Sequence, residues 1–160
     1  MKKEITVSYE EYASAQELAP ADAALVDLAR NVTKDAYAPY SRFRVGAAAR
    51  LSNGQIVTGT NQENAAYPVG ICAERTLLSV AASLFPGVAI DTLAVSYRNE
   101  QGTSDRPISP CGICRQSLQE FEQRTARSMR IILTGQSGKV MVLEGSATLL
   151  PFAFSSDELK

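Results

Sequence analysis

The pattern of apolar and polar residues predicts alternating strands and helices in the first half of the chain. Apolar residues at every second position over 5–12 indicate a short strand. From Pro20 to about residue 36 the apolar positions follow the spacing of an amphipathic helix that begins at a proline. The strand-like runs 43–51 and 55–60 flank an Asn-Gly pair, which favours a tight turn. These two runs therefore predict a β-hairpin.

The middle of the chain alternates polar loops with one helix and one strand. Residues 61–70 are polar, contain a proline and a glycine, and indicate a loop. A helical pattern begins at Cys72 and ends at the Phe-Pro-Gly segment 85–87. The mostly apolar run 88–97 is typical of a strand that is buried on both faces. A second polar loop, 98–110, follows it.

The last third predicts a helix after Cys111 and then a hairpin. The strand-like runs 128–135 and 139–144 flank a Gln-Ser-Gly turn, so we expect them to pair antiparallel. Mixed strands and helices over this length favour one sheet with helices on both faces. The chain shows no repeat or interdomain linker. We therefore expect a single domain over 20–160, preceded by an N-terminal extension over 1–19 that can add a strand.

Composition and charge narrow the class of protein. Of the 160 residues, 45% are hydrophobic and 21% are charged, as in globular domains. The net charge is −1 and the arginines are scattered, so the basic stripe of a polynucleotide-binding protein is missing. No apolar run approaches the roughly 18 residues of a membrane span, and no secretory signal opens the sequence. We expect a cytoplasmic protein with neither nucleic acid nor membrane as a partner.

The cysteines carry the candidate chemistry. The sequence holds three cysteines and no histidine, which excludes Ser-His-Asp and Cys-His catalysis and imidazole-based metal sites. Cys72 and the pair Cys111 and Cys114 stand where loops give way to predicted helices, and helix N-termini lower the pKa of a thiol. Three thiolates suit a Zn²⁺ ion. Three protein ligands and a water are the ligand set of catalytic zinc.

Glu74 is a candidate acid–base group beside these cysteines. It stands two residues after Cys72 in a Cys-Ala-Glu segment, and Pro110 directly precedes the Cys-Gly-Ile-Cys segment. Zinc deaminases of nucleobases use this order of first ligand, glutamate, proline and paired cysteines. In those enzymes the glutamate is no ligand and moves protons between water and substrate. The four elements in order favour a deaminase over three unrelated buried cysteines.

Longer segments resemble the small, homotetrameric, zinc-dependent cytidine deaminases that act on free nucleosides. The segments are YAPYSRFRVGAA, GTNQENAAYPVGICAERT, SPCGICRQ and LLPFAFSS, spread over about residues 36–159. The resemblance implies an α/β fold, a three-layer α/β/α sandwich with a mixed five-stranded sheet. It also implies one zinc ion per subunit, a pyrimidine nucleoside as substrate, and a homotetramer whose active sites are shared between subunits.

The resemblance assigns the metal and proton chemistry to four residues. Cys72, Cys111 and Cys114 match the zinc ligands, and Glu74 matches the proton shuttle. The implied reaction is the hydrolytic deamination of cytidine and deoxycytidine to uridine and deoxyuridine plus ammonia. Zinc-bound hydroxide attacks C4 of the pyrimidine and Glu74 carries the protons. The corresponding biological role is pyrimidine salvage.

The resemblance also assigns the substrate contacts. Asn61 and Glu63 match the pair that hydrogen-bonds the ribose hydroxyls, and Phe43 matches an aromatic of the nucleoside pocket. The backbone around Ala73 and Ser109 matches the segments at the polar edge of the pyrimidine, and Phe154 matches an aromatic from a neighbouring subunit. Arg75 and Gln116 match residues around the cysteine sulfurs.

Several of these residues also have an ordinary structural interpretation. Asn61 and Glu63 can satisfy the backbone of their own loop, as Asn commonly does. Phe43 and Phe154 are core residues by default, and Arg75 can be a solvated helix residue. For each of them the resemblance, and not the residue type, favours a role in binding.

Other functions remain open at the level of sequence. A Cys-Gly-x-Cys segment at a helix start is also used by thiol–disulfide oxidoreductases, although that function leaves the Cys72–Glu74 segment without a role. A zinc-stabilised binding module would not need Glu74 for its function. Among deaminases, enzymes for a cytosine-nucleoside antibiotic share the same cysteine motifs. Asn61, Glu63 and the LLPFAFSS segment favour an ordinary nucleoside with a free ribose.

Overall fold

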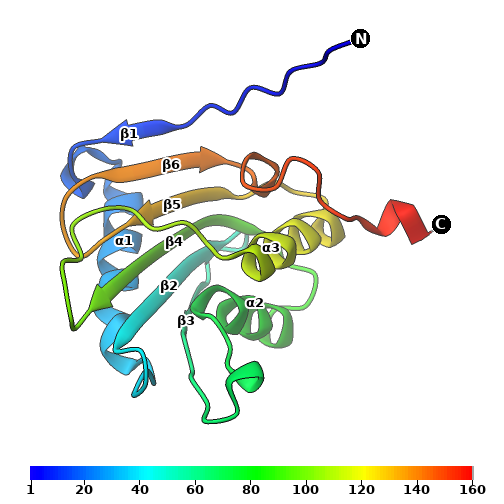
Figure 1. Cartoon of the computed structure of the whole chain (residues 1–160). Coiled ribbons are helices and arrows are strands. Elements are labelled where there is room, and N and C mark those ends of the chain that lie inside the picture. The colour runs from blue at the N-terminus through cyan, green and yellow to red at the C-terminus, as the bar shows by residue number, and fades with distance from the viewer. Residues whose placement is uncertain (160) are drawn as a thin grey trace.

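The computed structural model describes residues 1–159, which form one mixed β-sheet between two layers of helices (Figure 1). Over these residues the six strands lie in the order β1-β6-β5-β4-β2-β3. Their bounds are Glu10–Tyr12 for β1, Phe43–Leu51 for β2, Ile56–Thr60 for β3, Ile90–Asn99 for β4, Arg130–Thr134 for β5 and Val140–Glu144 for β6. The α-helices are α1 (Pro20–Val32), α2 (Ala73–Leu84) and α3 (Gly112–Thr125). The predicted α/β/α sandwich is confirmed.

Both predicted hairpins are present, and one parallel pair makes the sheet mixed. β2 pairs antiparallel with β3, and β5 pairs antiparallel with β6. β4 lies between β2 and β5, antiparallel to the first and parallel to the second. A parallel pair needs a crossover connection, and α3 supplies it. In this crossover the loop after β4 runs to the start of α3, where the segment with Cys111 and Cys114 lies.

The sheet has six strands instead of the expected five, because the N-terminal extension contributes β1. This strand pairs antiparallel with β6 and places Glu10 opposite Val142. The apolar alternation over 5–12 predicts a longer strand, but pairing is confined to residues 10–12. Pairing stops at Glu10 although β6 continues for two residues beyond Val142, so the chain leaves the sheet edge before its partner strand ends.

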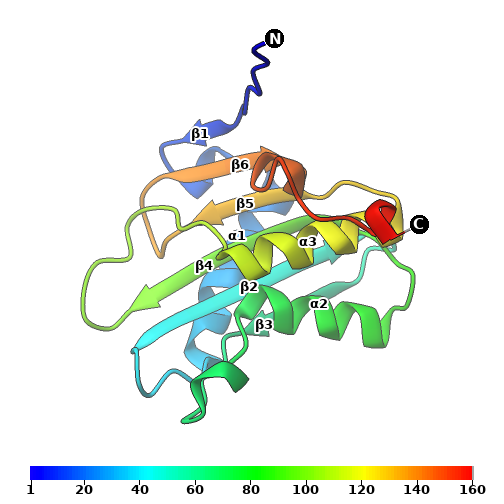
Figure 2. The ribbon, with the colours of Figure 1, turned by 45° about the vertical axis from the view of Figure 1, so that its right-hand side comes forward.

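The helices cover the two faces of the sheet unequally. α1 packs on one face, while α2 and α3 lie side by side on the other (Figure 2). Each face has its own buried apolar cluster, one around Leu77, Leu118 and Leu93 and the other around Val26 and Ala94. Apolar burial of this kind supplies most of the free energy of folding. The first cluster therefore fixes α2 and α3 in place on one face of the sheet, and the second fixes α1 on the other.

Two glycines let the helices approach the sheet closely on opposite faces. A Cβ atom at Gly59 in β3 would lie 2.5 Å from the backbone nitrogen of Leu77 and 2.6 Å from the carbonyl oxygen of Ala73, both in α2. A Cβ atom at Gly46 in β2 would lie 2.3 Å from the carbonyl oxygen of Ala29 in α1. Neither position has room for a side chain. Gly59 thus sets the distance between the sheet and the first turn of α2.

The extension is packed onto the same core as the rest of the chain. Ala15 and Leu18 are buried in the cluster under α1. The division into 1–19 and 20–160 stays a prediction, and Lys160, the last residue of the second range, lies outside the described residues.

No helix within 1–159 is both long enough and apolar enough to cross a membrane.

Candidate active site

Three sulfur atoms from two helix starts meet at one point. Cys72 and Cys111 are the residues immediately before α2 and α3, both in extended conformation, and Cys114 lies in the first turn of α3. The Sγ atom of Cys111 is 3.8 Å from that of Cys72 and 3.5 Å from that of Cys114. All three lie within 4.8 Å of one another. The cysteines are free of disulfides.

These distances fit a zinc ion. Thiolates at tetrahedral corners about 2.3 Å from zinc lie about 3.8 Å from one another, close to the observed separations. The sulfurs also differ in access, since Cys114 is buried, Cys72 is half-buried and Cys111 is exposed. Three thiolates with one corner left over make an open site in which a water or substrate can complete the tetrahedron.

The sulfurs perturb one another's protonation. A hydrogen bond with Cys114 is the main cause that lowers the pKa of Cys72, to about 6, against the effect of burial; a hydrogen bond with Cys111 and the positive charge of Arg75 contribute to the same shift. The same hydrogen bond and burial raise the pKa of Cys114. One sulfur in the cluster therefore ionises readily at the expense of its neighbour. A metal cation removes this conflict because it stabilises every thiolate at once.

Glu74 is a buried carboxyl group next to the sulfurs. Glu74 lies in the first turn of α2 and is only 5% exposed. Burial raises the pKa of Glu74 and the nearby Cys72 raises it further, whereas hydrogen bonds with its own backbone and with Cys114 lower it. The balance leaves the pKa above its ordinary value. A carboxyl group with a raised pKa can accept and release a proton near neutral pH.

Asn61 and Glu63 lie in the loop that follows β3, and both hold backbone. The side-chain oxygen of Asn61 accepts from the backbone N–H of Val45 at 2.7 Å, and its amide donates to the carbonyl of Phe43 at 2.9 Å. Oε2 of Glu63 accepts from the backbone N–H groups of Tyr40 and Ser41 at 2.9 and 3.2 Å. These bonds belong to the structural interpretation that the sequence left open.

The bonds at Glu63 also keep that side chain charged. Burial alone would raise the pKa of Glu63, but hydrogen bonds from the Ser41 side chain and from the Tyr40 and Ser41 backbone lower it below the ordinary value. Both backbone bonds use Oε2. A carboxylate accepts about four hydrogen bonds, so Oε1 can still accept from a hydroxyl group.

The other residues predicted for the substrate site occupy different environments. Phe43 is half-buried and stacks on Tyr97, with ring centroids 4.9 Å apart. Ala73 is fully buried at the start of α2, whereas Ser109 is exposed in the loop before the paired cysteines. Phe154 is 59% exposed in the C-terminal segment and is therefore not a core residue of its own subunit.

Comparison with known proteins identifies the family. The family profile for the "Cytidine and deoxycytidylate deaminase zinc-binding region" matches residues 20–129, a range that includes all three cysteines and Glu74. This chain is a member of the cytidine and deoxycytidylate deaminase family. The matched range begins after the N-terminal extension and ends before Phe154.

Individual relatives of the family match over nearly their whole length. Proteins named cytidine deaminase from Sporosarcina psychrophila and Halalkalibacterium halodurans are 40% and 36% identical over 136 and 135 residues. The alignments cover 84% of this chain in both cases, and 92% and 95% of the relatives. The crystal structure of cytidine deaminase from Burkholderia pseudomallei superposes with a TM-score of 0.71 at 38% identity, covering 82% of this chain and 97% of that one. The mixed sandwich is thus the fold of the deaminase family.

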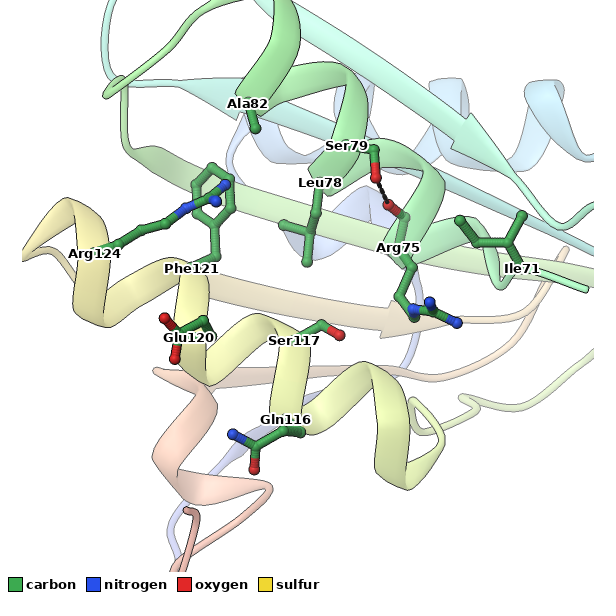
Figure 3. Close-up of a pocket in the computed structure, with 10 residues that line it drawn as sticks. All are labelled: Ile71, Arg75, Leu78, Ser79, Ala82, Gln116, Ser117, Glu120, Phe121 and Arg124. Carbon is green, nitrogen blue, oxygen red and sulfur yellow. Dashed lines mark hydrogen bonds between the residues drawn. The ribbon is translucent and has the colours of Figure 1, made fainter. Parts of the chain in front are cut away.

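A groove of about 420 Å³ between α2 and α3 is lined by Arg75 and Gln116, among other residues (Figure 3). Both residues are expected near the cysteine sulfurs of the deaminase. Arg75 lies close enough to Cys72 to lower the pKa of that thiol. The amide of Gln116 donates to the carbonyl of Phe154 at 2.8 Å. In this structure Gln116 therefore fixes the C-terminal segment, and its expected support of a sulfur stays a prediction.

Arg115 is a further deaminase residue that the sequence did not single out. Its Nε donates to the carbonyl of Pro110 at 2.8 Å, and its Nη1 donates to the carbonyl of Leu149 at 3.0 Å. The guanidinium thus joins the turn before Cys111 to the C-terminal segment. Its position next to Cys114 was the one available signal, because its partner carbonyl at Leu149 lies 34 residues away.

Proposed function

We propose that this chain is a zinc-dependent deaminase that hydrolyses cytidine and deoxycytidine to uridine and deoxyuridine plus ammonia. The observation that carries the proposal is the group of three sulfurs with the buried Glu74 beside it. A relative that is 40% identical over 136 residues bears the name cytidine deaminase, which supports the same substrate class. Pyrimidine salvage in the cytoplasm is the biological role that we propose with it.

The metal centre is assigned to the three cysteines. Cys72, Cys111 and Cys114 would hold the zinc ion, one per subunit. A bound zinc ion supplies Lewis acidity and lowers the pKa of a water to near neutrality, so that the water can attack the pyrimidine at C4. In the overall reaction a water adds at C4 and the amino group leaves from the same carbon as ammonia.

Glu74 is the proton carrier in this proposal. As a carboxylate it takes a proton from the attacking water, and it then delivers protons to N3 of the ring and to the leaving amino group. Burial at 5% exposure supports this role, because a raised pKa lets the carboxyl group hold the proton between the two transfers. General acid–base catalysis of this kind contributes about 10²–10⁴-fold to the rate.

The ribose and the base are assigned to the surrounding loops. Asn61 and Glu63 bind the ribose hydroxyls, and for Glu63 the acceptor is Oε1, the oxygen that neither backbone bond uses. Asn61 is bonded to the backbone of β2 and Glu63 to the loop before β2, and these bonds hold both side chains in position before the substrate arrives. Phe43, stacked on a buried tyrosine, packs against the nucleoside. The backbone around Ala73 and Ser109 binds the polar edge of the pyrimidine.

We also propose that the enzyme is a homotetramer whose subunits share active sites. The exposed Phe154 is the residue that one subunit contributes to the base in the next. Two features support this assignment. Phe152 and Phe154 are 87% and 59% exposed, and the backbone of Phe154 is held by Gln116 at the rim of the groove between α2 and α3.

The first experiment is the substitution Glu74→Gln, with Glu17→Gln as a matched control on an exposed glutamate of the extension. We expect Glu74→Gln to retain the melting temperature and one zinc per subunit but to lose turnover of cytidine, measured by the fall in ultraviolet absorbance. Glu17→Gln should retain all three properties. Full turnover by Glu74→Gln would contradict its role as proton carrier. A metal-free protein that cycles between dithiol and disulfide would favour an oxidoreductase instead.

The shared site has its own test, which uses the inactive Glu74→Gln variant of the first experiment. Differently tagged Glu74→Gln and Phe154→Ala subunits are co-expressed, and the mixed oligomers are purified by both tags. If Phe154 acts in the neighbouring subunit, some active sites combine an intact Glu74 with an intact Phe154, and activity exceeds that of either variant alone. A mixture of Glu74→Gln with the double variant should stay inactive. Absence of any gain would place Phe154 in its own subunit's site.

A further inference from the structure

The N-terminal residues 1–9 form an extended arm with exposed side chains. Both views show this arm leading away from the body of the molecule, beyond the start of β1 (Figures 1 and 2). Every residue of the arm is exposed, and the arm lies outside the range 20–129 that matches the deaminase family. The proposed chemistry leaves the arm without a role.

The arm continues an open edge of the sheet. β1 is the terminal strand, and within residues 1–159 its one partner is β6. The opposite edge of β1 presents backbone N–H and C=O groups to solvent, as edge strands do. Such an edge is a template for pairing with another extended segment.

The side chains of the arm are patterned as a strand with one apolar face. Ile5, Val7 and Tyr9 are 55%, 44% and 53% exposed and occupy alternate positions, so an extended backbone places them on the same face. Charge is also polarised along the segment. Lys2 and Lys3 stand at one end, and Glu10 and Glu11 stand at the other.

We propose that the arm pairs antiparallel with the arm of a second copy of this chain, about a two-fold axis at Thr6. In this register Lys2 lies opposite Glu10, and Lys3 lies opposite Tyr9. Ile5 lies opposite Val7, so the apolar faces of the two arms coincide. Opposite charges and apolar pairs that face each other across two strands stabilise their pairing.

The charges at the two ends of the arm favour antiparallel pairing, and they favour a second copy of the arm as the partner. A parallel arrangement in register would place lysine opposite lysine and glutamate opposite glutamate, which is destabilising. The antiparallel arrangement reverses one arm, so each basic end meets an acidic end. The sequence of the arm is thus complementary to itself, and a two-fold pair is closed and does not extend into a fibre.

The contacts of the acidic end inside one subunit are compatible with this pairing. Glu10 accepts a hydrogen bond from Tyr12 at 2.6 Å and lies 3.8 Å from Arg130. Glu10 nevertheless keeps a side chain that is 63% exposed, so Lys2 of another copy can reach it. In the isolated chain Lys2 lies 3.7 Å from Glu4, an exposed pair that contributes little to stability.

Pairing of the arms would join assemblies without covering the active site. β1 and β3 form opposite edges of the sheet, and α2, which carries Glu74, packs on β3. The proposal rests on the arm alone and does not depend on the proposed catalytic function. Activity and association can therefore be measured separately.

The experiment compares the mass of the zinc-loaded full chain with that of a variant lacking residues 2–9, by sedimentation at several concentrations. We expect the full chain to reach at least twice the mass of the deletion variant at high concentration, with unchanged kcat. High salt should weaken the association because it screens exposed charges. Equal masses at every concentration would overturn the proposal.

Charge variants test the register. Lys2→Glu combined with Lys3→Glu gives the arm acidic residues at both ends, so it should raise the dissociation constant for association at least tenfold. The matched control, Lys2→Arg with Lys3→Arg, keeps the charge and should associate like the wild type. Equal melting temperatures show that the variants are folded. Undiminished association of the acidic variant would also overturn the proposal.

Discussion

Replacing Gly59 by alanine should displace the helix that carries the first cysteine of the zinc site. Gly59 lies in β3 directly under the first two turns of α2. The added Cβ would be 2.5 Å from the nitrogen of Leu77 and 2.6 Å from the oxygen of Ala73. Both are backbone atoms of the helix, so no side chain can rotate away to relieve the clash.

The size of the displacement follows from these distances. Ordinary contacts of a Cβ atom begin near 3.4 Å, so the helix backbone must retreat by about 0.9 Å. Metal–ligand distances tolerate only about 0.2 Å. The crowding itself costs about 1–3 kcal/mol of folding stability. A misplacement near 1 Å at a reacting group costs about 10²-fold in rate, so we expect losses of that order in kcat/KM.

The assay measures zinc affinity, folding stability and turnover on the same preparations. Zinc affinity is obtained by competition with a chromogenic chelator, and stability by denaturant unfolding of the zinc-loaded protein. Gly46→Ala is the matched control, because its Cβ would meet the carbonyl of Ala29 at 2.3 Å in the opposite layer. We expect both variants to lose stability, but only Gly59→Ala to lose zinc affinity.

Wild-type zinc affinity in Gly59→Ala would refute this reasoning. It would show that α2 can move away from the sheet without carrying Cys72 away from the sulfurs of α3. Equal losses of zinc affinity in Gly59→Ala and Gly46→Ala would refute it as well, because a general loss of stability would then explain both results.

Three further substitutions test other contacts. Arg115→Lys keeps the charge but loses the fork that binds two carbonyls, so zinc affinity should fall about 10-fold to 100-fold in chelator competition. Glu122→Gln exchanges a buried carboxylate that accepts from three donors for an amide. The free energy of unfolding should fall by about 3 kcal/mol with unchanged zinc affinity. A loss of zinc affinity instead would contradict the structural role of Glu122. Glu63→Gln should raise KM for cytidine about tenfold, as expected for one charge-assisted hydrogen bond, while an unchanged KM would leave Glu63 as a loop residue only.

Much of the fold was predictable because its elements carry local patterns. The helix at Pro20, the two hairpins and the buried strand Ile90–Asn99 follow from periodicity and turn residues. The sixth strand was only partly predictable. Alternation over residues 5–12 indicates a strand, but only residues 10–12 pair with β6, and the local pattern does not show where the chain leaves the sheet edge.

The candidate site was predictable where its residues form short motifs and not where they act over long distances. The Cys-Ala-Glu and Pro-Cys-Gly-Ile-Cys segments identify the metal site because ligand type and spacing restrict the chemistry. Arg115 was missed, since its partner carbonyl at Leu149 lies 34 residues away. The contact of Gln116 with Phe154 was missed for the same reason, because it spans 38 residues.

The sequence by itself determined the kinds of atoms available to the site. With three cysteines and no histidine, imidazole is excluded, and the Cys-Ala-Glu and Cys-Gly-Ile-Cys segments offer sulfur to hold a metal and a carboxylate to move protons. The tertiary structure decided how those atoms meet. Close packing of α2 over Gly59, together with the crossover through α3, brings two helix starts together, so that sulfurs 39 residues apart lie within 3.8 Å. No local pattern encodes that distance, because it is set by the packing of both helices on one shared sheet.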